Sequence, residues 1–155
     1  MIKRGTIRSI KFALMVSRIA KPIGVNSELE DGNHILMWDF DDVPLEKVEF
    51  SLGVVSTRFM LSDIYILRTK EPDNYIAYCF SSFDWRQAVN IVIQTVYVDW
   101  QFVRFGVFRN KFTLRVTAKS GDHPYLVKRL EGKVLATAKP EDLKSWCRYE
   151  TISWK

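Results

Sequence analysis

Two aspartates, Asp39 and Asp41, end an apolar run that begins at His34. Successive side chains of a strand point to opposite faces, so residues two apart share a face and lie ~7 Å apart along the chain. Carboxylates held this close repel each other, and hard cations such as Mg²⁺ or Mn²⁺, which prefer oxygen ligands, compensate their charge. The pattern predicts a divalent-metal site. The alternative is a strand that ends in a solvated acidic turn, with Asp42 capping the next helix.

A third carboxylate, Asp99, follows the apolar run Val96 to Val98. Three carboxylates can hold two metal ions ~3.5–4 Å apart, and such a pair stabilises the attacking and leaving oxygens of a phosphoryl transfer. The alternative for Asp99 is a turn residue or a helix cap.

Basic residues interleaved with phenylalanines follow Asp99. Arg and Lys side chains beside a metal site would bind a triphosphate or a nucleic-acid backbone. A solvated face on which the stems of these side chains cover apolar surface is the alternative. The candidates are Arg104, Arg109 and Lys111.

The elements that must position these groups follow from periodicity. Apolar residues recur at three- and four-residue spacing after Pro44, whereas β-branched and aromatic runs on both sides of Pro72 indicate a hairpin. After the strand that carries Asp39, the sequence predicts a helix over 44–59, strands at 63–69 and 74–80, a helix over 82–93 capped by Ser82, and at least one strand within 102–108 and 112–117.

This is the split βαβ, or ferredoxin-like (RRM-like), order of an α+β fold. With right-handed crossovers it forms a mostly antiparallel four-stranded sheet with both helices on one face and the first strand in the middle. The 155 residues are expected to form one domain with its core at about 35–117. The N-terminal extension, 1–33, should contain one or two strands and a polar loop. In the extension 118–155, a basic loop precedes a short helix opening at 139–142 and a strand.

The net charge of +5 favours a polyanionic partner, against the alternative of an ordinary basic surface. Basic residues concentrate at 2–21 and 104–133. Exposed aromatic side chains could stack on bases, although most strand aromatics belong to cores. The candidate nucleic-acid contacts in the second segment are Arg115, Lys119, Lys128 and Arg129.

Cysteine and histidine usage excludes several classes. Cys79 and Cys147 form no CxxC pair and only two histidines occur, which argues against zinc-ribbon, thioredoxin-like and histidine-rich metal sites. No apolar stretch approaches the ~18 residues of a membrane span, and the basic start has no signal-peptide core. A cytoplasmic protein with reduced thiols and no membrane partner is expected.

Three motifs together resemble the archaeo-eukaryotic primase superfamily, including its primase-polymerase and plasmid replication branches. They are Asp39-x-Asp41, the hairpin strands over 68–78, and Val98-Asp99 with the basic residues that follow, within about 35–117. The resemblance implies an RRM-like catalytic core in which Asp39, Asp41 and Asp99 bind two Mg²⁺ or Mn²⁺ ions. It also implies nucleoside triphosphates and DNA or RNA as substrates.

One position departs from the family pattern. The second motif of the family carries a histidine that contacts the phosphates of the incoming nucleotide, and Ile76 stands there in this chain. Either Arg68 or Lys70 takes over that contact, or the nucleotide site is impaired.

Three function classes follow. The first is a metal-dependent nucleotidyltransferase of primase or polymerase type that primes or extends nucleic acid in DNA replication or repair. The second is a non-catalytic module that binds single-stranded nucleic acid on an RRM-like sheet. The third is a replication-associated interaction domain.

Overall fold

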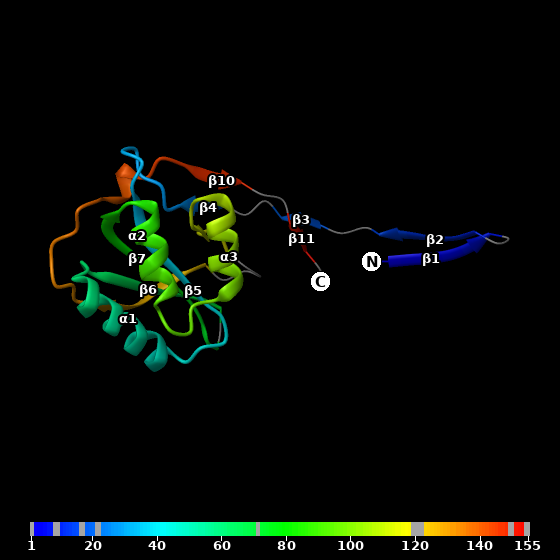
Figure 1. The fold of residues 1–155 in the computed structure, drawn as a ribbon. Coiled ribbons are helices and arrows are strands. Elements are labelled where there is room, and N and C mark those ends of the chain that lie inside the picture. Colours follow the sequence, from blue (N-terminus) through cyan, green and yellow to red (C-terminus); the bar gives the residue numbers. More distant parts are fainter. Residues whose placement is uncertain are drawn as a thin grey trace.

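The computed structural model describes residues 2–7, 10–15, 18–20, 23–70, 72–118, 123–148 and 151–153, with side chains described for 23–70, 72–118 and 123–146. Its centre is an antiparallel four-stranded sheet, shown with the helices in Figure 1. The strands, in spatial order, are β5 (His34–Phe40), β7 (Asn74–Phe83), β6 (Ile64–Lys70) and β9 (Tyr125–Leu130).

Two helices follow the predicted order. Helix α1 (Leu45–Phe59) connects β5 to β6, and α2 (Trp85–Ile93) follows the β6–β7 hairpin. Helix α2 packs against β5 and β7, and both helices contribute buried apolar side chains to one core. The predicted α+β fold, compatible with a split βαβ arrangement, is therefore confirmed.

The register of β5 and β7 gives the central sheet two different faces. Trp38 stands opposite Ala77, and its Nε1–H donates to Thr95 Oγ1 (2.8 Å) just beyond α2, so these residues mark the helix face. Asp39 stands opposite Ile76 on the other side, which we call the outer face. Trp38 is fully buried whereas Asp39 is only partly buried, so the strand carries a core residue and a carboxylate at adjacent positions.

The prediction that the first strand lies in the middle of the sheet is wrong. Strand β5 is an edge strand, and the fourth strand is β9, which pairs with β6 at the opposite edge. Strand β8 (Thr113–Arg115) lies beside β5 but forms its hydrogen bonds with β4 (Ile23–Asn26). Because β8 pairs with β4, it belongs to a second sheet. The strand order of that sheet is β10-β4-β8, in which β10 is Trp146–Arg148.

The segment 102–108 is helical rather than extended, and of the two predicted strand regions only 112–117 contributes a strand, β8. Helix α3 (Trp100–Arg109) buries Phe102, Val103 and Gly106, which recur at helical spacing. Phe102 stacks on Phe112 with ring centroids 5.0 Å apart. A Cβ at Gly106 would lie 2.4 Å from Phe112 Cδ1, so this glycine permits the close approach of α3.

Several predicted boundaries also change. Strand β7 continues through Ser82, and Asp84 rather than Ser82 caps α2, its Oδ1 accepting from the Gln87 N–H (2.9 Å). Asp42 does not cap α1, whose N-cap is Pro44 without a side-chain hydrogen bond. The predicted helix at 139–142 is a single 3-10 turn, η1 (Pro140–Asp142). Pro140, at the start of the turn, has no backbone N–H to donate. After the turn the chain extends into β10.

The N-terminal extension forms more strands than predicted. Strands β1 (Ile2–Ile7) and β2 (Ile10–Met15) pair as a hairpin, and β3 (Arg18–Ala20) pairs with β11 (Thr151–Ser153). None of the helices in the described part of the chain is both long enough and apolar enough to cross a bilayer.

Candidate metal centre

The end of β5 positions two of the three predicted carboxylates. Asp39 is the penultimate residue of the strand and is partly buried, whereas Asp41 is exposed in the turn that follows. The neighbouring Asp42 has a left-handed φ of 56°, which turns the chain away from the strand direction. A strand end therefore holds this pair at the rim of the outer face.

The third carboxylate is brought to the same place by main-chain bonding. The Asp99 N–H donates to the Asp39 carbonyl oxygen (2.8 Å), which fixes the loop between α2 and α3 against the end of β5. The Asp99 side chain caps α3: its Oδ1 accepts from the Gln101 N–H (3.2 Å) and its Oδ2 from the Phe102 N–H (2.7 Å). Asp99 is thus a helix cap, as the alternative interpretation held, and it also lies beside Asp39.

The three carboxylates come together as one group. One oxygen from each of Asp39, Asp41 and Asp99 lies within 4.8 Å of the others. An all-oxygen set of this kind fits Mg²⁺ or Mn²⁺ rather than softer metals. The positive end of the α3 dipole at Asp99 offsets part of the negative charge, but three carboxylates leave an excess that a cation would neutralise.

A small cavity of about 170 Å³ opens beside the group on the outer face. This is room for several waters, or for a hydrated ion or a metal-bound phosphate group. The walls combine carboxylates, hydroxyls, one guanidinium and one apolar side chain. The lining residues are Asp39, Asp41, Thr69, Ile76, Thr113, Leu114, Arg115, Thr117 and Pro124.

Tyr78 lies near Asp39 on the outer face, opposite Met37. Burial, and secondly the Asp39 carboxylate, raise the pKa of the Tyr78 phenol, so it stays protonated at neutral pH. Its Oη is buried and has no hydrogen-bond partner among the described residues. A buried hydroxyl without a hydrogen-bond partner lowers the stability of the folded state. Such unpaired groups are common in functional regions.

The basic residues predicted to bind nucleotide phosphates do not converge on this cavity. Arg68 lies on the helix face, where its Nη2–H donates to Tyr75 Oη (2.7 Å) and its guanidinium lies over the Tyr75 ring. Lys70 is exposed at the end of β6. Neither side chain lines the cavity that Ile76 lines.

The predicted cations that follow Asp99 do not line the cavity. Arg104 is exposed one turn from Asp99, and Arg109 lies over the Phe105 ring, 5.6 Å from its centroid. The ten residues of α3 rise ~15 Å, so Arg109 and Lys111 are at the far end of the helix from Asp99. Lys111 is paired there with Glu28 (3.8 Å).

The predicted nucleic-acid contacts are dispersed. Arg115 lines the cavity beside Asp39. Lys128 and Arg129 of β9 form ion pairs with Glu49 and Asp63, respectively. Lys119 lies outside the described residues.

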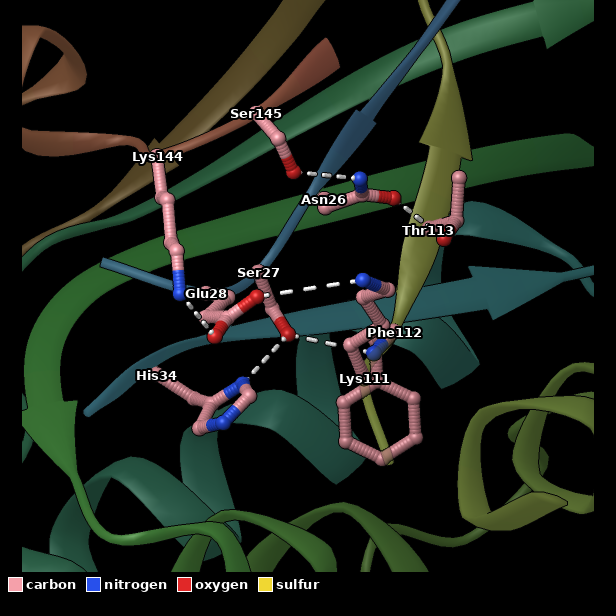
Figure 2. Close-up of polar contacts among 9 residues, drawn as sticks. All are labelled: Asn26, Ser27, Glu28, His34, Lys111, Phe112, Thr113, Lys144 and Ser145. Carbon is pink, nitrogen blue, oxygen red and sulfur yellow. Dashed lines mark hydrogen bonds and ion pairs between the residues drawn. The ribbon is translucent and has the colours of Figure 1, made fainter. Parts of the chain in front are cut away.

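Sequence reasoning missed a buried polar cluster where β4, β5 and β8 meet (Figure 2). Ser27 Oγ lies 3.0 Å from His34 Nδ1 and accepts from the Phe112 N–H (3.1 Å). Ser27 Oγ can donate to this nitrogen when the imidazole is neutral with its proton on Nε2. Burial lowers the pKa of His34, consistent with this form.

This cluster is structural. Ser27 is completely buried, so its hydroxyl is inaccessible to a substrate. Glu28 pairs with Lys144 (2.8 Å), and that hydrogen bond is the main reason that the pKa of Glu28 is lowered. Asn26 links Ser145 to Thr113. No motif could have revealed the cluster, because Ser27 and Phe112 are 85 positions apart.

Comparison of the chain with protein-family models, with curated proteins and with solved structures finds no match. The resemblance to primases therefore depends on the motifs and on the arrangement of the carboxylates.

Proposed function

We propose that this protein is a metal-dependent nucleotidyltransferase of primase or polymerase type, which primes or extends nucleic acid in DNA replication or repair. The observation that carries the proposal is the meeting of Asp39, Asp41 and Asp99, with an oxygen of each within 4.8 Å of the others. Asp39 and Asp41 come from the end of β5 and Asp99 from the start of α3, and a cation between them would offset their mutual repulsion.

The three carboxylates would hold Mg²⁺ or Mn²⁺, whose charge would stabilise the negative charge that develops on a transferring phosphoryl group. The Asp99 carboxylate is already oriented by two main-chain hydrogen bonds, so it would lose little freedom on binding an ion. Asp41 is exposed and supplies the solvent-facing ligand.

Arg115 is our choice for the phosphate contact that the histidine makes in primases. Arg68 lies on the helix face, and Ile76 contributes no polar atom. Arg115 lines the same cavity as Asp39 and Asp41, and a guanidinium binds phosphate oxygens through two parallel hydrogen bonds. The Thr117 hydroxyl, which accepts from the Ile23 N–H, would add a neutral donor.

The partners follow from the same proposal: nucleoside triphosphates, and DNA or RNA as the strand that is extended. We also place the protein in the cytoplasm, where the buried free thiol of Cys79 would stay reduced.

The test is incorporation of labelled dNTP or NTP on a primed template with Mn²⁺ or Mg²⁺. Asp39→Asn and Asp41→Asn keep the side-chain shape and remove one charge each. Metal binding contributes several kcal/mol to such a transition state, so we expect each substitution to lower the rate at least ~100-fold.

Asp42→Asn is the matched control. It removes the same charge one residue away, and Asn tolerates the left-handed backbone of this position. Its rate should equal that of the wild type. Incorporation that survives both Asp39→Asn and Asp41→Asn would overturn the proposal. If the wild type binds single strands without metal but incorporates nothing, the non-catalytic binding module replaces it.

A further inference from the structure

A second and larger opening lies on the outer face, under the segment Glu131–Lys139, which we call the strap. At its start, the Gly132 N–H donates to Asp63 Oδ1 (2.8 Å) and the Lys133 N–H to the Leu61 carbonyl (2.7 Å). At its end, the N–H groups of Thr137 and Ala138 both donate to the Phe80 carbonyl (3.1 and 2.9 Å). The strap is therefore tied to the central sheet at both ends.

The start of the strap admits no side chain. A Cβ at Gly132 would lie 2.3 Å from the Ser62 carbonyl carbon, so only glycine allows this approach of two main chains. The Gly132 N–H, and secondly Arg129, lower the pKa of Asp63, which keeps the anchoring carboxylate ionised. The anchor is thus built into the fold.

The groove between the strap and the sheet has a volume of about 760 Å³, within the range of ligand-binding clefts. Tyr65 and Phe80, on adjacent strands, form its floor with ring centroids 6.3 Å apart in an edge-to-face arrangement. Both aromatic side chains are only partly buried. Leu135 on the strap is 90% exposed, so the groove also has an uncovered apolar edge.

The rim of the groove is cationic. Its charged lining residues are Asp63, Arg129, Lys133 and Lys139. Arg129 and Asp63 neutralise each other, whereas neither Lys133 nor Lys139 forms an ion pair with a residue that the structure describes. An aromatic floor with two uncompensated ammonium groups fits a flat, anionic ligand better than an apolar peptide.

The groove and the metal centre share one face of the sheet. Phe80 lies four residues from Ile76 along β7, and Ile76 stands opposite Asp39, so the floor is ~13 Å from the carboxylates. That is the length of about four stacked nucleotides at ~3.4 Å each, and of fewer when they are unstacked. One strand could occupy both places.

We propose that the strap groove binds single-stranded nucleic acid, with a base stacked on the Phe80 ring, which Tyr65 contacts edge-to-face, and backbone phosphates on Lys133 and Lys139. The statement that this strand also reaches the carboxylates rests on the proposed function. Binding in the groove does not, since it requires no metal.

The test is fluorescence anisotropy of labelled dT12 and U12 in EDTA, over a range of salt concentrations. The double variant Lys133→Ala/Lys139→Ala should weaken binding and lower the slope of log affinity against log salt by about 1.4, which is ~0.7 for each lost phosphate contact. Phe80→Leu keeps an apolar side chain but removes the stacking surface, so binding should weaken ~5- to 150-fold.

Lys47→Ala/Arg86→Ala is the matched control, since it removes two exposed charges of α1 and α2. It should change the salt slope far less than the strap variant. The two lysine substitutions alter only exposed side chains, so their result stands even if Phe80→Leu unfolds the protein.

The outcomes separate this proposal from the proposed function. Weakened binding in the strap variants, with far smaller changes in Lys47→Ala/Arg86→Ala, supports the groove whether or not the protein is an enzyme. Wild-type binding and salt slope in the double lysine variant would overturn it, even if metal-dependent incorporation is found. Equal competition by free dTMP, at the same nucleotide concentration, would also overturn the assignment to a strand.

Discussion

Replacing Asp41 by Asn should make the metal-free protein more stable and the metal-bound protein less stable than the wild type. The Asp41 oxygen lies within 4.8 Å of oxygens from Asp39 and Asp99, so each pair repels by ~0.9 kcal/mol in water. Salt and side-chain motion reduce the sum. We expect Asp41→Asn to raise the free energy of unfolding by about 1 kcal/mol without metal, or ~2–4 °C in melting temperature.

Metal should reverse this order. An ion at 100 times its dissociation constant stabilises the folded wild type by ~2.7 kcal/mol. Asp41→Asn keeps two of three carboxylates and should gain much less from the same concentration of Mn²⁺. The measurement is urea denaturation of both proteins in EDTA and in Mn²⁺, with Asp42→Asn as the control that should follow the wild type.

Two results would refute this reasoning. One is a wild type whose stability does not respond to Mn²⁺ at millimolar concentration, which would mean that the three carboxylates hold no ion. The other is an equal gain in Asp41→Asn, which would place the ion elsewhere in the protein.

Two further predictions concern buried polar groups. Tyr78→Phe should stabilise the protein by about 1 kcal/mol in urea denaturation, because the Tyr78 hydroxyl is buried without a partner among the described residues. The matched variant Tyr75→Phe removes the acceptor of Arg68 and should destabilise by ~1.5–3 kcal/mol, and the opposite order would contradict both assignments. Burial lowers the pKa of His34, so the folded state binds fewer protons than the unfolded state just below the usual histidine pKa of ~6.5. Stability should therefore be complete above that pH and fall as the pH decreases below it, whereas His34→Gln should flatten this slope, and an unchanged slope would exclude His34 as its cause.

Local patterns predicted the elements better than their assembly. The helical spacing after Pro44 and the hairpin around Pro72 lie within short segments, and both are present. The edge position of β5 depends on which strand accepts β8, and that choice is made by β4, about 90 residues away in the sequence. Pairing between such distant strands depends on the whole fold, so no window of the sequence encodes it.

The prediction of at least one strand within 102–108 and 112–117 is confirmed by β8, whereas 102–108 is helical. Phenylalanines at 102, 105 and 108 recur every three residues, which suits a helix better than the alternation of a strand. The decisive residue is Asp99, whose carboxylate accepts from two N–H groups of the first turn of α3. The sequence offers the cap and the metal ligand as alternatives for Asp99, whereas the structure gives it the cap position beside Asp39.

The gathering of the three carboxylates is a consequence of the fold rather than of attraction between them. Asp99 is placed by its own N–H, bound to the Asp39 carbonyl, and the preceding loop is anchored where Trp38 Nε1–H donates to Thr95. Neither bond uses a carboxylate oxygen, so both hold the carboxylates in place against their repulsion whether or not an ion is bound. Such preorganisation lets a site bind a cation without reordering its ligands. Asp41 takes part in neither of these two hydrogen bonds. Substituting Asp41 should therefore change the electrostatics of the site and leave the main-chain framework around it intact.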